Sequence, residues 1–109
     1  MFTGFPSAHA EDMTTTLHIE NTVHDYDSWK LAFDKFDRFR AENGVRSYRV
    51  TRSADDPHEV VVELDFDSTG VAEAFAQLLQ KVWQTPQSQQ HLVRHSAPTM
   101  RHLVENRAF

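Results

Sequence analysis

The chain has 109 residues, no cysteine and a formal net charge of −5 at pH 7. This length suits one domain, and the absence of cysteine excludes a disulfide framework, a thiolate metal site and a cysteine nucleophile. The negative charge argues against nucleic acid and anionic membranes as partners, and no apolar run approaches the ~20 residues that a membrane span needs. A cytoplasmic location is compatible with this composition.

The first third of the chain predicts a flexible segment over residues 1–13, then a strand and a helix. The segment lacks the basic start and apolar centre of a signal peptide. Apolar and polar residues alternate over 14–23, which predicts a strand. Asp25 or Asp27 can cap a helix that runs to about Glu42. The apolar stripe of this helix recurs every three or four residues and comprises Trp29, Ala32, Phe33, Phe36 and Phe39.

The middle of the chain predicts a β-hairpin. Asn43-Gly44 ends the first helix because glycine takes the left-handed cap conformation without steric cost. Strands are predicted over 45–53 and 58–67, since β-branched and aromatic residues alternate with polar ones there. The turn between them, 54–57, contains aspartates and a proline, so the two strands pair as neighbours.

The last part predicts a second helix and a final strand. Residues 67–69 offer a cap, and the helix runs to about Trp83. The polar stretch 84–96 predicts at most a short helical turn, 99–105 a strand and 106–109 a fraying tail. The apolar face of the second helix comprises Val71, Phe75, Leu78, Leu79 and Val82.

The element order β-α-β-β-α-β predicts an α+β, ferredoxin-like domain over residues 14–105. Right-handed crossovers then place both helices on one face of a four-stranded antiparallel sheet. The other face carries His18, Glu20, Arg49 and Glu63 among its residues, and either meets water or is covered by a second copy of the chain. The residues predicted to face the helices are Leu17, Ile19, Tyr48, Val50, Val60, Val62, Leu64 and Phe66.

Four segments within residues 18–105 carry a resemblance to a known family. They are the strand-to-helix join at 23–30, the Asn43-Gly44-Val45 break, and the hairpin and helix segments at 55–66 and 72–75. In these features the chain resembles the dimeric α+β barrel superfamily, and in particular small proteins like the antibiotic-biosynthesis monooxygenases.

The resemblance implies a homodimer whose two sheets face each other, here through Glu20, Arg49 and Glu63, with a cleft for a small-molecule ligand between the sheet and the helices of each subunit. It implies a monooxygenase or cyclase that acts on an apolar or aromatic substrate and needs no cofactor. A non-catalytic binding module on the same fold is the alternative. Haem or metal binding is a further alternative, although no histidine lies between Val71 and Trp83 to match the helix histidine of haem-degrading relatives.

Tyr48 and His102 are the candidate catalytic residues. A phenol and an imidazole beside an apolar cleft can orient a phenolic substrate and transfer a proton. The alternatives are that Tyr48 only packs its ring, and that the register of the last strand turns His102 away from the cleft.

The candidate substrate-binding residues are Asn21, Trp29, Trp83 and Met100. Asn21 is expected at the mouth of the cleft, and the two tryptophans would bracket a flat ligand. At helical spacing the tryptophans are also typical core residues, and Met100 is also typical gap-filling material. His91 and His95 would share a helix face, but without a third ligand they predict no metal site.

Overall fold

The computed structural model describes residues 14–109, so the predicted flexible segment 1–13 lies outside the described residues. No helix in residues 14–109 has the length and apolar character to cross a membrane. In chain order the elements are β1 (Thr15–Val23), α2 (Tyr26–Asp34), α3 (Asp37–Glu42), β2 (Val45–Arg52), β3 (Glu59–Phe66), α4 (Thr69–Trp83), α5 (Pro86–His91), β4 (Leu92–His95) and β5 (Thr99–His102).

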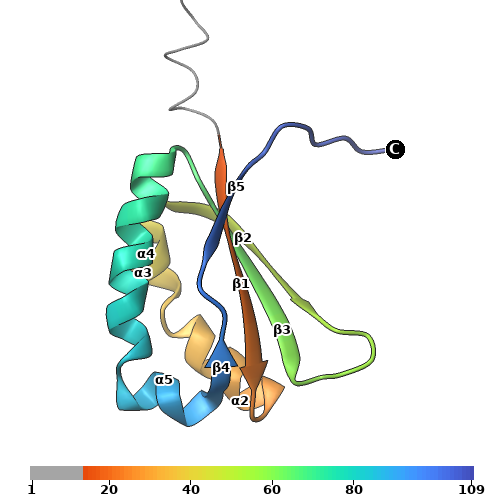
Figure 1. Ribbon diagram of the computed structural model, residues 1–109, viewed down its shortest axis with the longest axis vertical. Helices are drawn as coiled ribbons and strands as arrows, with labels where there is room; N and C mark the ends of the chain where they lie inside the picture. Colours follow the sequence, from red (N-terminus) through yellow and green to blue (C-terminus); the bar gives the residue numbers. More distant parts are fainter. Residues whose placement is uncertain (1–13) are drawn as a thin grey trace, which may run out of the picture.

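The sheet is antiparallel and has the order β2-β3-β1-β4, with β5 also paired to β1. The shorter strands β4 and β5 share one edge of β1, where β4 pairs with residues 21–23 and β5 with residues 15–18. Figure 1 shows the helices gathered on one side of this sheet. The predicted ferredoxin-like α+β fold is therefore confirmed, with its fourth strand divided in two.

The division of the fourth strand corrects the prediction for the end of the chain. Residues 84–96 contain not only the short helix α5 but also β4, and the strand predicted over 99–105 ends at His102. At the interruption, the Ser96 amide donates to the Glu20 carbonyl at 2.7 Å and the Ser96 hydroxyl accepts from the Glu20 amide at 2.9 Å. Pro98 follows and has no N–H group for the ladder, so pairing stops until Thr99.

A break in the first helix is a second correction, because one continuous helix to about Glu42 was predicted. The amides of Lys35 and Phe36 turn back to carbonyls three residues earlier, at 3.2 and 3.1 Å. The Arg40 side chain donates from Nη2 to the Phe33 carbonyl oxygen at 2.6 Å. A side chain that bonds to a carbonyl of the helical ladder is a known cause of a sharp bend. The aromatic stripe continues across this break, so its spacing gave no sign of it.

The caps follow the predicted chemistry. The Asp25 carboxylate accepts from the Ser28 amide at 2.9 Å, and the Ser68 hydroxyl accepts from the Val71 amide at 3.3 Å. Gly44 follows α3 and has a φ of 98°, as predicted for the end of the first helix. A Cβ atom at Gly44 would also clash with Val71 Cγ1, so this position needs glycine for space as well as conformation.

The core lies between the sheet and the helices. Of the eight residues predicted to face the helices, Val50 is partly buried and Tyr48 is 38% exposed, while the other six are buried. Tyr48 is the exception because β2 is an edge strand, where the tyrosine ring is covered only in part by Phe33 and Arg40. Across the layers, the Phe75 ring of α4 lies 5.3 Å from that of Phe66 on β3.

We predict that Phe66→Ala lowers the free energy of unfolding by about 3–5 kcal/mol, because Phe66 is fully buried and its ring would leave a cavity. Urea denaturation followed by circular dichroism measures this loss. The matched control is Phe109→Ala, which removes the same ring from a fully exposed position and should leave the unfolding free energy unchanged. Equal losses in the two variants would contradict the assignment of the core.

Candidate functional site

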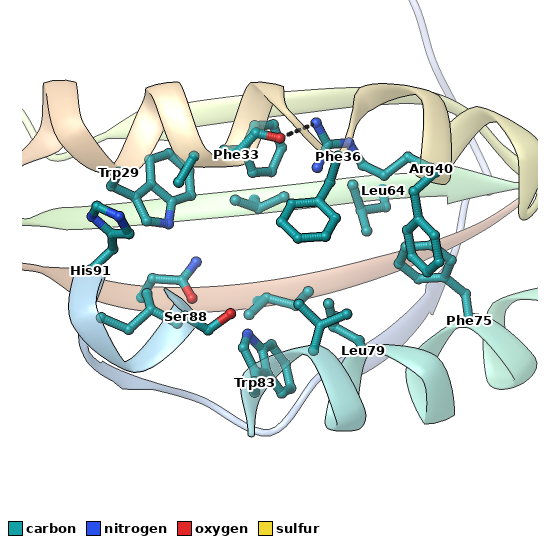
Figure 2. Close-up of a pocket in the computed structure, with 17 residues that line it drawn as sticks. Trp29, Phe33, Phe36, Arg40, Leu64, Phe75, Leu79, Trp83, Ser88 and His91 are labelled. Atoms are coloured by element: carbon teal, nitrogen blue, oxygen red, sulfur yellow. Dashed lines mark hydrogen bonds between the residues drawn. The ribbon is translucent and has the colours of Figure 1, made fainter. Parts of the chain in front are cut away.

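A cavity of about 120 Å³ separates the helices from the sheet and is partly open to solvent. Its walls are mostly aromatic and aliphatic, and Figure 2 shows Trp29 and Phe36 facing Leu79 and Trp83 across it. The lining residues come from β1, β3, the start of β4, the four helices of residues 14–109 and the turn between α2 and α3. They are Ile19, Asn21, Trp29, Ala32, Phe33, Phe36, Phe39, Arg40, Val62, Leu64, Phe75, Leu79, Val82, Trp83, Ser88, His91 and Leu92.

Besides Arg40, three polar side chains, Asn21, Ser88 and His91, line this mostly apolar space. Asn21 lies on β1 and is 5% exposed, and its Nδ2 donates to the Val60 carbonyl at a long 3.4 Å. Within the described chain the Asn21 side-chain oxygen accepts no hydrogen bond, so it can accept one from a ligand. The cavity therefore offers an amide, a hydroxyl and an imidazole to a bound molecule.

The short helix α5 places Ser88 and His91. Thr85 caps it by accepting from the Ser88 amide at 3.3 Å, and Pro86 occupies the first turn, where its missing N–H costs nothing. The His91 carbonyl then accepts from the His24 amide at 3.2 Å, which fixes the end of α5 to the end of β1. In Figure 2, His91 lies toward the same end of the cavity as Trp29.

Arg40 is the charged residue of the wall, and it is only 6% exposed. Burial lowers the pKa of its guanidinium from the ordinary value, while nearby Tyr48 and Asp37 act in the opposite direction. The group still carries its charge, because an arginine does not lose its proton in proteins. Its plane lies over the Phe33 ring, 3.7 Å from the centroid, and 5.1 Å from the Tyr48 ring.

The structure brings together three of the six predicted site residues. Asn21, Trp29 and Trp83 all line the cavity. Tyr48 lies outside the cavity lining, where its ring packs edge to face with that of Phe33, 5.3 Å between centroids.

Met100 and His102 also lie away from the cavity. They pair with Leu17 and Thr15, both buried on the helix side of β1, so the register places them on that face. Both are exposed, however, and β5 runs beside the start of β1, whereas Asn21 lies beside β4.

Sequence reasoning missed Arg40, Ser88 and His91 as cavity residues. A usable signal existed for Arg40, which follows Phe36 by four positions and Phe33 by seven and so continues the apolar stripe with a cation. His91 was considered only in a pair with His95. The two do not share a helix face, because His91 ends α5 and His95 ends β4, where its ring stacks on Trp83 at 3.7 Å. Residues 14–109 contain no group of three side chains suited to a metal ion.

The outer face of the sheet carries a network of paired charges. Arg49 Nη2 lies 2.7 Å from Glu63 Oε1, and His18 Nδ1 lies 3.0 Å from Glu63 Oε2. The other ring nitrogen of His18 lies 3.2 Å from Glu20 Oε2. Hydrogen bonds to Glu63 and Glu20 raise the pKa of His18 above 6.5. Hydrogen bonds from His18 and Arg49 lower the pKa of Glu63 below 4.5.

Among known proteins, similarity to this chain is found at the level of the three-dimensional structure. No protein-family model matches the sequence, and no curated protein matches it. Solved structures do match. SnoaB, a cofactor-independent oxygenase from Streptomyces nogalater, has 11% identity and a TM-score of 0.57, with 88% of this chain and 96% of that one covered.

Two further structures extend the match. A candidate antibiotic biosynthesis monooxygenase from Bordetella bronchiseptica has 12% identity and a TM-score of 0.65, with 89% and 99% of the two chains covered. A dimeric ferredoxin-like protein from an uncultured marine organism has 7% identity and a TM-score of 0.62, with 94% and 98% covered. The chain has the fold of these proteins. The resemblance inferred from the sequence is thus confirmed at the level of the fold, which hosts many functions.

We predict that the contribution of His18 to stability depends on pH. A histidine with a raised pKa in the folded state stabilises below its unfolded value of 6.5 and loses this effect as the pH rises through the raised value. The native chain should have a higher unfolding free energy than His18→Gln. This difference should be larger at about pH 5.5 than at about pH 8.5, by up to about 1 kcal/mol. The control, His24→Gln, replaces an exposed histidine. A His18→Gln difference that is constant with pH would contradict the network.

Proposed function

We propose that the chain binds a small, mostly apolar or aromatic molecule in the cavity between its helices and its sheet. The observation that carries this proposal is the cavity itself, which is walled by aromatic rings and offers a few polar groups. A cavity of about 150 Å³ lined by apolar side chains is large enough for benzene. The cavity here, at about 120 Å³, is somewhat smaller, so a single aromatic ring would fill it and reach the opening, and a larger molecule would extend further through that opening.

Cofactor-independent oxygenation or cyclisation is the reaction class that this geometry supports best. His91 would take or return a proton, Asn21 and Ser88 would orient the polar atoms of the substrate, and the aromatic walls would exclude water. The shared fold with SnoaB, described as a cofactor-independent oxygenase, supports the same reaction class.

A non-catalytic binding module is the second candidate. It is favoured by the positions of Tyr48 and His102, which lie outside the cavity lining and cannot act there without rearrangement. The two candidates differ in one observable. An enzyme would consume oxygen or convert the bound molecule, for example a phenol, and a binding module would release that molecule unchanged.

We predict that p-cresol binds the native chain and that Ala32→Leu abolishes this binding. Ala32 lines the cavity from α2, and a leucine there would occupy part of the space for the ring. Saturation-transfer NMR measures the binding. The matched control is Ala74→Leu, which makes the same change at an exposed position of α4 outside the lining and should leave the signal intact. Absence of binding to the native chain, or equal binding by both variants, would contradict the cavity as the ligand site.

We also propose that two copies of the chain pair through the outer sheet face around Glu20, Arg49 and Glu63. Two solved structures with this fold are described as dimeric. The half-buried Val61 lies on this face beside the charge network, where it pairs with Glu20 on β1 and with Thr51 on β2. A second copy would bury this apolar centre, and the charged residues would surround it.

Light scattering should show two chains per particle for the native protein and one for Arg49→Glu, which sets a second acid against Glu63 at the proposed contact. The control, Arg38→Glu, makes the same charge reversal beside Glu42 on the exposed surface of α3 and should remain a dimer. A native protein that is monomeric at all concentrations would refute the pairing.

A further inference from the structure

We infer that the ligand of the cavity carries an anionic group, in the simplest case a carboxylate, and that Arg40 is the residue that recognises it. This inference rests on the proposed binding function and adds the charge of the ligand to it. Among the lining residues Arg40 is the permanent cation, whereas the other lining side chains are apolar or carry an amide, a hydroxyl or an imidazole.

The charge of Arg40 is poorly balanced inside the chain. Its nearest carboxylate belongs to Asp37, where Nη2 and Oδ1 are 3.7 Å apart, beyond hydrogen-bond distance. The Asp37 side chain is 68% exposed, so water screens it, whereas that of Arg40 is 7% exposed. No other carboxylate of residues 14–109 forms an ion pair with Arg40. A buried cation without a bonded anion is costly, and a ligand carboxylate in contact with it would reduce this cost.

The hydrogen bonds of Arg40 are also incomplete. Nη2 donates to the Phe33 carbonyl, but Nε is buried and has no partner within the described part of the chain. Buried donors are nearly always satisfied, so an unsatisfied one calls for a partner. A guanidinium presents its N–H groups in a planar fork, and a carboxylate matches this fork with two parallel hydrogen bonds.

The position of Arg40 suits a ligand that has one polar end. Figure 2 shows its side chain on the wall formed by the first two helices, reaching back to the Phe33 carbonyl beside Phe36. His91 comes from α5 at the end where Trp29 lies. A ring among the aromatic residues would place its anionic group at Arg40 and leave His91 for its opposite side. An aromatic acid, with a carboxylate on a single ring, has this distribution of charge.

Arg40 also has a structural role at the break between α2 and α3, and this role must be separated from recognition. The bond to the Phe33 carbonyl uses Nη2 and requires no ligand. A structural residue would change the stability of the chain but would not distinguish a charged ligand from a neutral one of the same shape. The affinity ratio of such a pair of ligands is therefore the informative measurement.

The experiment compares 4-methylbenzoate with 4-methylbenzamide, which has the same shape and no charge, by isothermal titration calorimetry at neutral pH. The native chain should bind the carboxylate at least tenfold more tightly. Arg40→Met keeps much of the apolar stem and removes the fork, so the two affinities should become equal. Arg38→Met, at a side chain that is 89% exposed on the same helix, should keep the native ratio.

Equal affinities in the native chain, or a preference that survives in Arg40→Met, would overturn the role of Arg40 while leaving the cavity as a binding site. Binding of neither compound to the native chain would overturn the proposed binding function, and this inference with it. The comparison within the native chain decides the question even if Arg40→Met fails to fold.

Discussion

The contact among three phenylalanine rings holds the helices against the sheet. The Phe75 ring of α4 lies 5.3 Å from that of Phe66 on β3 and 5.8 Å from that of Phe39 on α3, so one ring links α3 and α4 to the sheet. Aromatic side chains bury about 150–250 Å² each, which lets a chain with 39% hydrophobic residues form a core from few positions. The cavity lies beside this cluster and shares Phe39 and Phe75 with it, so the packing that stabilises the fold also shapes the site.

The fold follows from the sequence because its signals are local and agree with one another. The alternation of apolar and polar residues places Leu17 and Ile19 in the core. Helices α2 and α4 begin after Asp25 and Ser68, whose side chains accept hydrogen bonds from free backbone amides of the first turn. The break before α3 was not predictable in the same way, since it depends on the Arg40 side chain reaching the Phe33 carbonyl. A tertiary contact of this kind leaves no trace in the periodicity of the stripe.

The site was predictable only where apolar periodicity or strand parity determined it. Trp29 and Trp83 reach the cavity because the apolar stripes of α2 and α4 face the sheet, and Asn21 because it shares parity with Ile19. His102 lies on the predicted side but at the far end of β1, because the divided fourth strand sets its register. Distance along a sheet is not contained in parity, so Tyr48 and His102 were expected nearer the cavity than they lie.

Ligand binding by this chain requires an accessible, apolar space between the helices and the sheet. A crystal of the native chain under xenon pressure tests this directly, because xenon enters dry apolar cavities. We expect xenon density enclosed by Phe36, Phe75 and Leu79, with little movement of these side chains. Absence of xenon, with the same three side chains packed against one another, would contradict the cavity and every function assigned to it.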